Sequence, residues 1–298
     1  MRVMKVLLCL VIGFLFFSCN NLFFPTSQSD MHKIGVFAPD PDYEYAPETI
    51  LIDSALTVRV GPSWDPKLWD QLEVYSIEPY RIGKYELTNL QYYQFVLEGG
   101  YNTESYWSKE GWQAKIDSGW TGPKFWGTSI PPWLDDPYSH HENTPVHGIS
   151  FYEAEAYCSW LSENTGLSYG IPTTAQWERA SKGPDPGYKY TWGNEYAEGI
   201  AHYIFYGYES LPDLLPVNCY EIGKSQDGCY NMIGNAYELA EPYIHFQNNE
   251  VVKVIYSRNM MPISDVEEIK KVLTTTAYMV FGAYERFYGV GVRICRNY

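Results

Sequence analysis

One short segment carries residue types that could gather oxygen atoms around a bound group. It reads YNMIGNAYELAEP (Tyr230 to Pro242) and places Asn231, Gly234, Asn235 and Glu238 within eight residues. Glycine and asparagine are poor helix formers, but they accept backbone angles that other residues avoid. We therefore expect the backbone here to turn its carbonyl oxygens toward something, with Glu238 supplying a carboxylate.

The N-terminus indicates where the protein is located. Arg2 and Lys5 precede an apolar run from Val6 to Phe17, which has the layout of a secretory signal and is too short for a comfortable membrane span. The run ends in FFSC, which resembles the lipobox of bacterial lipoproteins. We expect residues 1–19 to be a lipoprotein signal in which Cys19 is acylated, so that lipid chains anchor the protein in the bacterial cell envelope, on the periplasmic face or the cell surface. The alternative is a plain signal peptide with a coincidental cysteine.

The remaining thiols belong to an exported and oxidising setting. Of six cysteines, Cys9 and Cys19 fall in the signal, which leaves Cys158, Cys219, Cys229 and Cys295. Four cysteines allow three pairings. A bridge from Cys219 to Cys229 would close a short loop and is easy to form, and it would leave Cys158 to pair with Cys295.

The composition favours an irregular domain packed by aromatic side chains. The chain of 298 residues is 45% hydrophobic and 17% aromatic, with 28 Tyr and 10 Trp, and it has few long aliphatic repeats. Its formal charge of −15 repels phosphate backbones, so nucleic acid is excluded as a partner. We expect residues 20–42 to be a tether and residues 43–298 to form one domain.

Local patterns predict where the helices and strands begin and end. Alternating residues predict strands at 57–60 and 72–80. Capping residues predict three helices, which start at Thr88, at Ser150 with Glu153, and at Thr173 with Gln176, and which stop at Gly99, Gly166 and Gly183. The charged segment 264–273 predicts a surface helix.

Several of these segments resemble, in order and spacing, the formylglycine-generating enzyme family, also called sulfatase-modifying factor domains. The matching segments are RIGKYELTNLQYYQF (81–95), PVHGISFYEAEAYCSWLSENTGLSYGIPTTAQWERASKG (145–183), YTWGNE (190–195) and GCYNMIGNAYELAEP (228–242). The resemblance covers roughly residues 78–298. It implies an α+β, C-type-lectin-like fold in a single domain with little regular secondary structure.

The resemblance also implies a calcium site and a disulfide. Its calcium ligands would be the Asn231 side-chain oxygen, the Gly234 and Ala236 carbonyls and the Glu238 carboxylate, a set that suits a hard cation with irregular geometry. The alternative is that Asn231 and Glu238 only satisfy turn amides. A second calcium site of the family is not expected, because His202 stands where it needs an oxygen. The family pairing also implies a Cys158–Cys295 bridge, in agreement with the loop argument.

The chemistry of the family is not carried over. Formylglycine generation needs a copper-binding cysteine pair, since thiolates hold Cu(I), and this chain has no cysteine from Tyr230 to Ile294. No copper is expected. The three-histidine iron pattern of the related sulfoxide synthases is also absent. We therefore expect a non-catalytic binding or structural protein; the alternative is an enzyme of this family that acts through an unrecognised site.

Aromatic residues mark two candidate surfaces for a protein or carbohydrate ligand. One is the insertion from Tyr106 to Trp133, and the other is the tyrosine-rich C-terminal region. The candidate residues are Trp107, Trp112, Trp120, Trp126, Tyr278, Tyr284 and Tyr288. The alternative for the tryptophans is that they pack the insertion onto the core.

Overall fold

The computed structural model describes residues 39–40, 43–127, 141–184, 186–202, 214–241, 252–256, 270 and 273–298. The predicted signal, Cys19 and most of the tether lie outside the described residues, as does most of the predicted helix at 264–273. Within the described part, no helix is long and apolar enough to cross a membrane.

Short helices and strands alternate along the chain. The helices are η1 (Pro66–Gln71), α3 (Asn89–Leu97), η2 (Glu104–Tyr106), α4 (Lys109–Ser118), α5 (Phe151–Thr165), α6 (Thr174–Lys182) and η4 (Glu221–Gly223). The strands are β1 (Pro39–Asp40), β2 (Tyr43–Pro47), β3 (Thr49–Ile52), β4 (Thr57–Arg59), β5 (Val74–Ser76), β6 (Tyr80–Gly83), β7 (Tyr169–Gly170), β8 (Tyr237–Ala240), β9 (Val252–Tyr256), β10 (Tyr278–Gly282), β11 (Val290–Val292) and β12 (Cys295–Asn297). Strand β1 pairs with β2, so paired structure begins inside the predicted tether.

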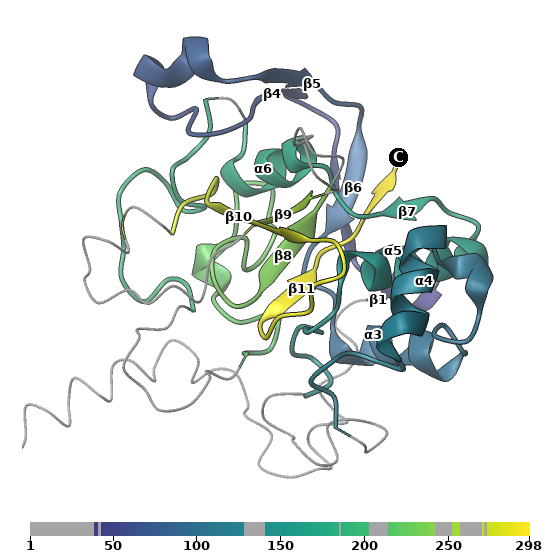
Figure 1. Ribbon diagram of the computed structural model, residues 1–298. Helices are drawn as coiled ribbons and strands as arrows, with labels where there is room; N and C mark the ends of the chain where they lie inside the picture. The colour runs from purple at the N-terminus through teal and green to yellow at the C-terminus, as the bar shows by residue number, and fades with distance from the viewer. Residues whose placement is uncertain are drawn as a thin grey trace, which may run out of the picture.

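The end of the chain joins the two larger sheets of the described structure. One sheet has the order β10-β9-β8-β11, and the other has the order β3-β6-β12-β7. Strand β11 runs parallel to β8, whereas β12 lies between β6 and β7 and is antiparallel to both. Figure 1 shows β11 leading directly toward the C-terminus, with α3, α4 and α5 gathered on one side. Residues 290–297 therefore hold both sheets together.

The three helix starts predicted from capping residues are confirmed. Thr88, Ser150 and Thr173 each accept a backbone N–H from the third helical residue, whose own side chain accepts the N–H of the capping residue in return. These reciprocal bonds satisfy amides that a helix start otherwise leaves without partners. Helix α5 ends at Gly166 in the left-handed conformation, as its sequence predicts.

Helix α4 lies in the tryptophan-rich insertion and was not predicted from the sequence. Ser108 caps its first turn, and Gly119 ends it with a φ of 67°. Gly111 faces Tyr152 of α5 so closely that a Cβ would lie 2.9 Å from the Tyr152 Cβ. The helix is thus fixed by packing against α5, which a local sequence pattern does not reveal.

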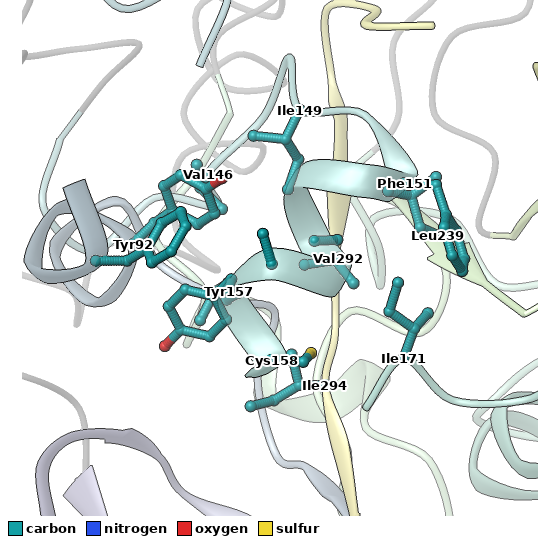
Figure 2. Packing of buried hydrophobic residues seen from close by; sticks show 14 of the residues in the cluster. Tyr92, Val146, Ile149, Phe151, Tyr157, Cys158, Ile171, Leu239, Val292 and Ile294 are labelled. Atoms are coloured by element: carbon teal, nitrogen blue, oxygen red, sulfur yellow. The ribbon is translucent and has the colours of Figure 1, made fainter. Parts of the chain in front are cut away.

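Aromatic rings build the main core around α5. Tyr92 and Phe95 of α3 contact Tyr157 of α5, with ring centroids 5.4 and 5.9 Å apart, and Trp160 closes the group. Figure 2 shows aliphatic side chains from β8, β11 and the following residues packing on the other side of the same helix. Each fully buried ring contributes about 1.5–3 kcal/mol, so α5 and its neighbours form the rigid base of the candidate site.

Candidate functional site

The Asn-Gly segment, residues 230–238, bends sharply before it becomes strand β8. Asn231, Gly234 and Asn235 have φ angles of 52°, 87° and 60°, which place them in the left-handed region. Gly234 is required there, because a Cβ would lie 2.3 Å from the backbone oxygen of His202. The same His202 oxygen accepts the N–H of Asn235 at 2.9 Å. The bent backbone expected from the sequence is therefore present.

Glu86 lies inside this bend and was not found from the sequence. Its carboxylate accepts hydrogen bonds from Asn231 Nδ2 at 2.9 Å, Asn235 Nδ2 at 3.0 Å and the Ala236 N–H at 3.0 Å. Glu86 is 1% exposed and immediately precedes the capped start of α3. The only indication in the nearby sequence is that Glu86 lies two residues before the Thr88 cap. This pattern is too common to identify Glu86 as part of the site.

Hydrogen bonds fix the orientation of the Asn231 side chain. Its Nδ2 donates both to Glu86 and to the Val217 carbonyl at 2.9 Å. Since both partners are acceptors, the nitrogen must face them and Oδ1 must face the other way. Among the described residues, Oδ1 accepts no hydrogen bond. The oxygen that was predicted to bind calcium is therefore held in place and available.

Glu238 forms a buried ion pair with Arg293, the residue that follows β11. Arg293 Nη2 lies 2.8 Å from Glu238 Oε1, and its Nε donates to Oε2 at 3.0 Å. Trp177 Nε1 also donates to Oε2, at 2.6 Å. Both charged side chains are 0% exposed. Within the described residues Oε1 accepts a single hydrogen bond, from Arg293, so it keeps a lone pair with which it could also bind a cation.

The bend holds two buried carboxyl groups, Glu86 and Glu238, that interact with each other. Burial first, and then the charge of Glu238, raise the pKa of Glu86 to about 8. Arg293 is the cation facing these two carboxylates. The described residues contain no group of three or more His, Cys, Asp and Glu side chains that could hold a metal. A cation at the bend would instead use amide, carbonyl and carboxylate oxygens, which fits calcium rather than a transition metal.

The four cysteines of the domain are buried. In the structure Cys158, Cys229 and Cys295 are free thiols, so neither predicted bridge is formed in it, and both stay predictions for the oxidised protein. Burial raises the pKa of Cys229 to about 11 and that of Cys295 to about 12. Burial, followed by the neighbouring Cys295, also raises the pKa of Cys158 well above its ordinary value.

The tryptophans of the insertion pack inward, which corrects the prediction that Trp107 and Trp120 contact a ligand. Both are 7% exposed and belong to the main core, and Trp107 Nε1 donates to the Gly100 carbonyl at 2.8 Å. Trp112 and Trp126 are partly buried against the same core. The tryptophan rings thus attach the insertion to the core, which is the alternative stated for them in the sequence analysis.

The C-terminal tyrosines lie where a ligand can reach them. Tyr278 is 44% exposed, and Tyr284 is 63% exposed. Tyr284 belongs to the aromatic loop, which we define as residues 283–289, and this loop also exposes 40% of Phe287, a residue absent from the predicted set. Tyr288 is half-buried and packs against His147 and Phe125, with ring centroids 4.5 and 5.4 Å apart. The aromatic loop is the candidate ligand-contacting surface.

Comparisons with known proteins agree with this architecture. Hercynine oxygenase of Mycobacterium tuberculosis is 32% identical over 200 residues, which are 63% of this chain and 43% of that protein. A protein of Mus musculus named inactive C-alpha-formylglycine-generating enzyme 2 is 25% identical over 194 residues, 55% of this chain and 49% of its own. The chain therefore spans less than half the length of these curated relatives.

Solved structures show the same fold. PvdO from Pseudomonas aeruginosa superposes with a TM-score of 0.59 and 17% identity, covering 86% of this chain and 97% of PvdO. A likeness at this identity establishes the fold alone. The family model described as the sulfatase-modifying factor enzyme 1-like domain matches residues 38–297. The chain accordingly belongs to the family of sulfatase-modifying factor enzyme 1-like domains, also known from formylglycine-generating enzymes.

Proposed function

We propose that this protein is a membrane-anchored, calcium-stabilised binding protein built on a formylglycine-generating-enzyme scaffold that has no copper chemistry. The observation that carries this proposal is the state of its thiols. A reactive or metal-binding cysteine needs a lowered pKa and access to solvent. Cys158, Cys229 and Cys295 are buried and have raised pKa values, and the sequence from Tyr230 to Ile294 holds no cysteine pair. One similar protein is named an inactive C-alpha-formylglycine-generating enzyme, which is a precedent for a member of the family without this activity.

We expect the folded protein to be inert toward thiol reagents and copper. In the full chain purified in detergent, a thiol reagent at pH 8 should label no cysteine of the domain, because all four are buried and burial raises the pKa of Cys158, Cys229 and Cys295. After unfolding and reduction, all four should react. Metal analysis after incubation with Cu(I) should find no stoichiometric copper. A fast-reacting native thiol or one tightly bound copper per chain would contradict the proposal.

The second candidate function is enzymatic. It is favoured by the 32% identity to a protein named hercynine oxygenase, although this chain spans only 43% of that protein. Elemental analysis of the protein as purified separates the two functions. Stoichiometric iron would favour the enzyme, whereas calcium without iron or copper would favour the binding protein.

Calcium is proposed for the bend of the Asn-Gly segment. Asn231, the carbonyls of Gly234 and Ala236, and Glu238 would hold it, and calcium would supply positive charge next to two buried carboxylates. Three observations support this: the fixed orientation of Asn231, the remaining lone pair of Glu238 and the second buried carboxyl group, Glu86, whose ionisation a bound cation would favour. In this role the ion stabilises the fold and takes no part in a reaction.

The membrane anchor is proposed from the N-terminal sequence. The charged and apolar signal, followed by Cys19, would place lipid chains at the new N-terminus, and the segment up to β1 would connect the domain to the membrane. This arrangement suits a protein that captures a ligand at the cell envelope.

The exposed rings favour a neutral sugar as the ligand. Exposed Tyr284 and Phe287 can stack on the apolar faces of sugar rings. A chain with a net charge of −15 repels acidic glycans, so uncharged oligosaccharides fit it better.

Binding to neutral oligosaccharides tests the ligand-contacting surface. On an array of neutral and acidic glycans, we expect the full chain to bind neutral glycans. Tyr284→Ala and Phe287→Ala should each weaken binding about tenfold, which corresponds to about 1.4 kcal/mol for a lost stacking contact. Ile222→Ala is the matched control, since Ile222 is 72% exposed on η4, outside the aromatic loop. The proposed sugar ligand would be refuted if the full chain bound no glycan on the array. It would also be refuted if Tyr284→Ala and Phe287→Ala both bound glycans as tightly as the wild type does.

A further inference from the structure

The side chain of Arg286 attaches the middle of the aromatic loop to the domain. Arg286 lies between the exposed rings of Tyr284 and Phe287, yet its own side chain is only 10% exposed. The guanidinium points inward while its neighbours in the chain point outward. Because the side chain of Arg286, at the centre of the loop, is held inside the domain, the rings of Tyr284 and Phe287 on either side are kept in a fixed position.

The guanidinium of Arg286 contacts two distant parts of the chain at once. Its Nε lies 3.0 Å from Glu153 Oε2 and donates to the Gly148 carbonyl at 3.1 Å, both at the start of α5. Its Nη2 donates to the Gly122 carbonyl in the tryptophan-rich insertion, and its carbon atom Cζ lies 5.0 Å above the ring of Trp120. One planar group thus connects the aromatic loop, α5 and the insertion.

The partner of this guanidinium is itself held firmly. Glu153 is 0% exposed and is the capping-box residue of α5, so its Oε2 also accepts the Ser150 N–H at 2.7 Å, and its Oε1 accepts the Tyr101 hydroxyl. Burial raises the pKa of Glu153, while the charge of Arg286 acts in the opposite direction. A buried carboxylate with these donors has little freedom to move, so the loop that it anchors through Arg286 is equally restricted.

Among the described residues, the backbone bonds that join the loop to other segments lie near its ends. The Ala283 carbonyl accepts the Phe151 N–H at 3.1 Å, and the Val290 carbonyl accepts the Gly148 N–H at 2.9 Å. Between these ends, the contact of Arg286 is reinforced from the insertion by Lys124 Nζ, which donates to the Arg286 carbonyl at 3.4 Å. The side chain of Arg286 is thus the main attachment of the loop centre.

We infer that Arg286 is a positioning residue that joins the aromatic loop and the tryptophan-rich insertion into one preorganised surface for the ligand. This inference rests on the proposed function, because it assigns Arg286 the role of orienting the rings that contact the ligand. The buried tryptophans then serve binding indirectly, as the support to which the loop is attached. Lysine cannot replace this arginine, since its single ammonium cannot reach acceptors on α5 and on the insertion together.

The test compares amide hydrogen exchange in the full chain and in Arg286→Lys, both in detergent. We expect exchange to become about tenfold faster in residues 283–289 and 119–126 and to stay unchanged elsewhere. The melting temperature should stay near that of the wild type, while the affinity for the neutral glycan falls about tenfold. Arg286→Ala should show larger changes in the same two segments. Lys115→Ala is the matched control, because Lys115 lies 4.6 Å above the Trp112 ring in the insertion, and within the described part of the chain no hydrogen bond or ion pair joins it to the aromatic loop.

Each possible result decides one question. If exchange is unchanged, or rises evenly over the whole chain, Arg286 is not a positioning residue and the inference is wrong. If exchange rises in the two segments but the wild type binds no glycan, the attachment is real and the proposed ligand is wrong. If Tyr284→Ala weakens binding while Arg286→Lys changes neither exchange nor affinity, the proposed ligand surface stands and the positioning role is refuted.

Discussion

Replacing Arg293 by methionine is expected to lower the free energy of unfolding by about 3–5 kcal/mol, because it leaves the buried carboxylate of Glu238 without its cation. Arg293 is 0% exposed, and besides Glu238 it donates to the Gly83 carbonyl at 2.7 Å and the Tyr230 carbonyl at 2.6 Å. Burial alone would lower the pKa of Arg293, but the charge and hydrogen bonds of Glu238 raise it above its ordinary value. The pair is therefore charged in the folded protein.

The position of Arg293 explains why the loss should be large. Its donors join the end of β6, the start of the Asn-Gly segment and strand β8, which belong to different sheets or to the bend itself. Removing the guanidinium leaves two carbonyl oxygens and one carboxylate in need of new partners inside the domain. Such groups each cost about 1–3 kcal/mol when they are left buried without a hydrogen bond.

Urea unfolding followed by tryptophan fluorescence measures this loss. Arg81→Met is the matched control, since Arg81 of β6 is half-buried and donates only to Thr49, at 2.9 and 3.0 Å. We expect that variant to lose about 1 kcal/mol. The double variant Arg293→Met with Glu238→Gln removes both charges, so it should lose less than the sum of the two single variants. A loss for Arg293→Met no greater than that for Arg81→Met would contradict the prediction.

Local rules predicted the starts of α3, α5 and α6, whereas contacts between distant segments determined the site. The capping boxes at Thr88, Ser150 and Thr173 each lie within four residues, and the structure has all three. Glu86, in contrast, gains its role from Asn231 and Asn235, which lie 145 and 149 residues away in sequence. No window of the sequence shows that these residues meet.

The same distinction explains the tryptophans and the arginine anchor. The sequence shows that the insertion is rich in aromatic residues, but the direction of Trp107 and Trp120 depends on α5 and the C-terminal region against which they pack. Arg286 meets the Gly122 carbonyl across 164 residues. A resemblance between families conveys conserved motifs and the fold, and it carries no information about an insertion outside those motifs. The attachment of the aromatic loop to the insertion is therefore visible only in the structure.

The structure also changes which residue best tests the calcium site. Glu238 is a proposed ligand, but it is also the partner of Arg293, so removing it would disturb an ion pair as well as a cation. Asn231 is a cleaner choice, because its φ of 52° is readily adopted by glycine. Asn231→Gly removes the proposed ligand oxygen and keeps the bend of the backbone.

Asn231→Gly is therefore expected to abolish the calcium-dependent rise in melting temperature, which in the wild type reflects about 2.7 kcal/mol at calcium a hundredfold above its dissociation constant. Asn235→Gly is the matched control: Asn235 has a φ of 60° in the same bend and the same hydrogen bond to Glu86, but it is not a proposed ligand. Both variants lose a bond to Glu86 and should be less stable in a chelator, yet only Asn235→Gly should regain stability with calcium. Magnesium should give a smaller rise in the wild type, since it needs near-octahedral geometry. If Asn231→Gly responds to calcium as the wild type does, or Asn235→Gly fails to respond, then Asn231 Oδ1 is not a ligand and the bend is folded around the carboxylate of Glu86 alone.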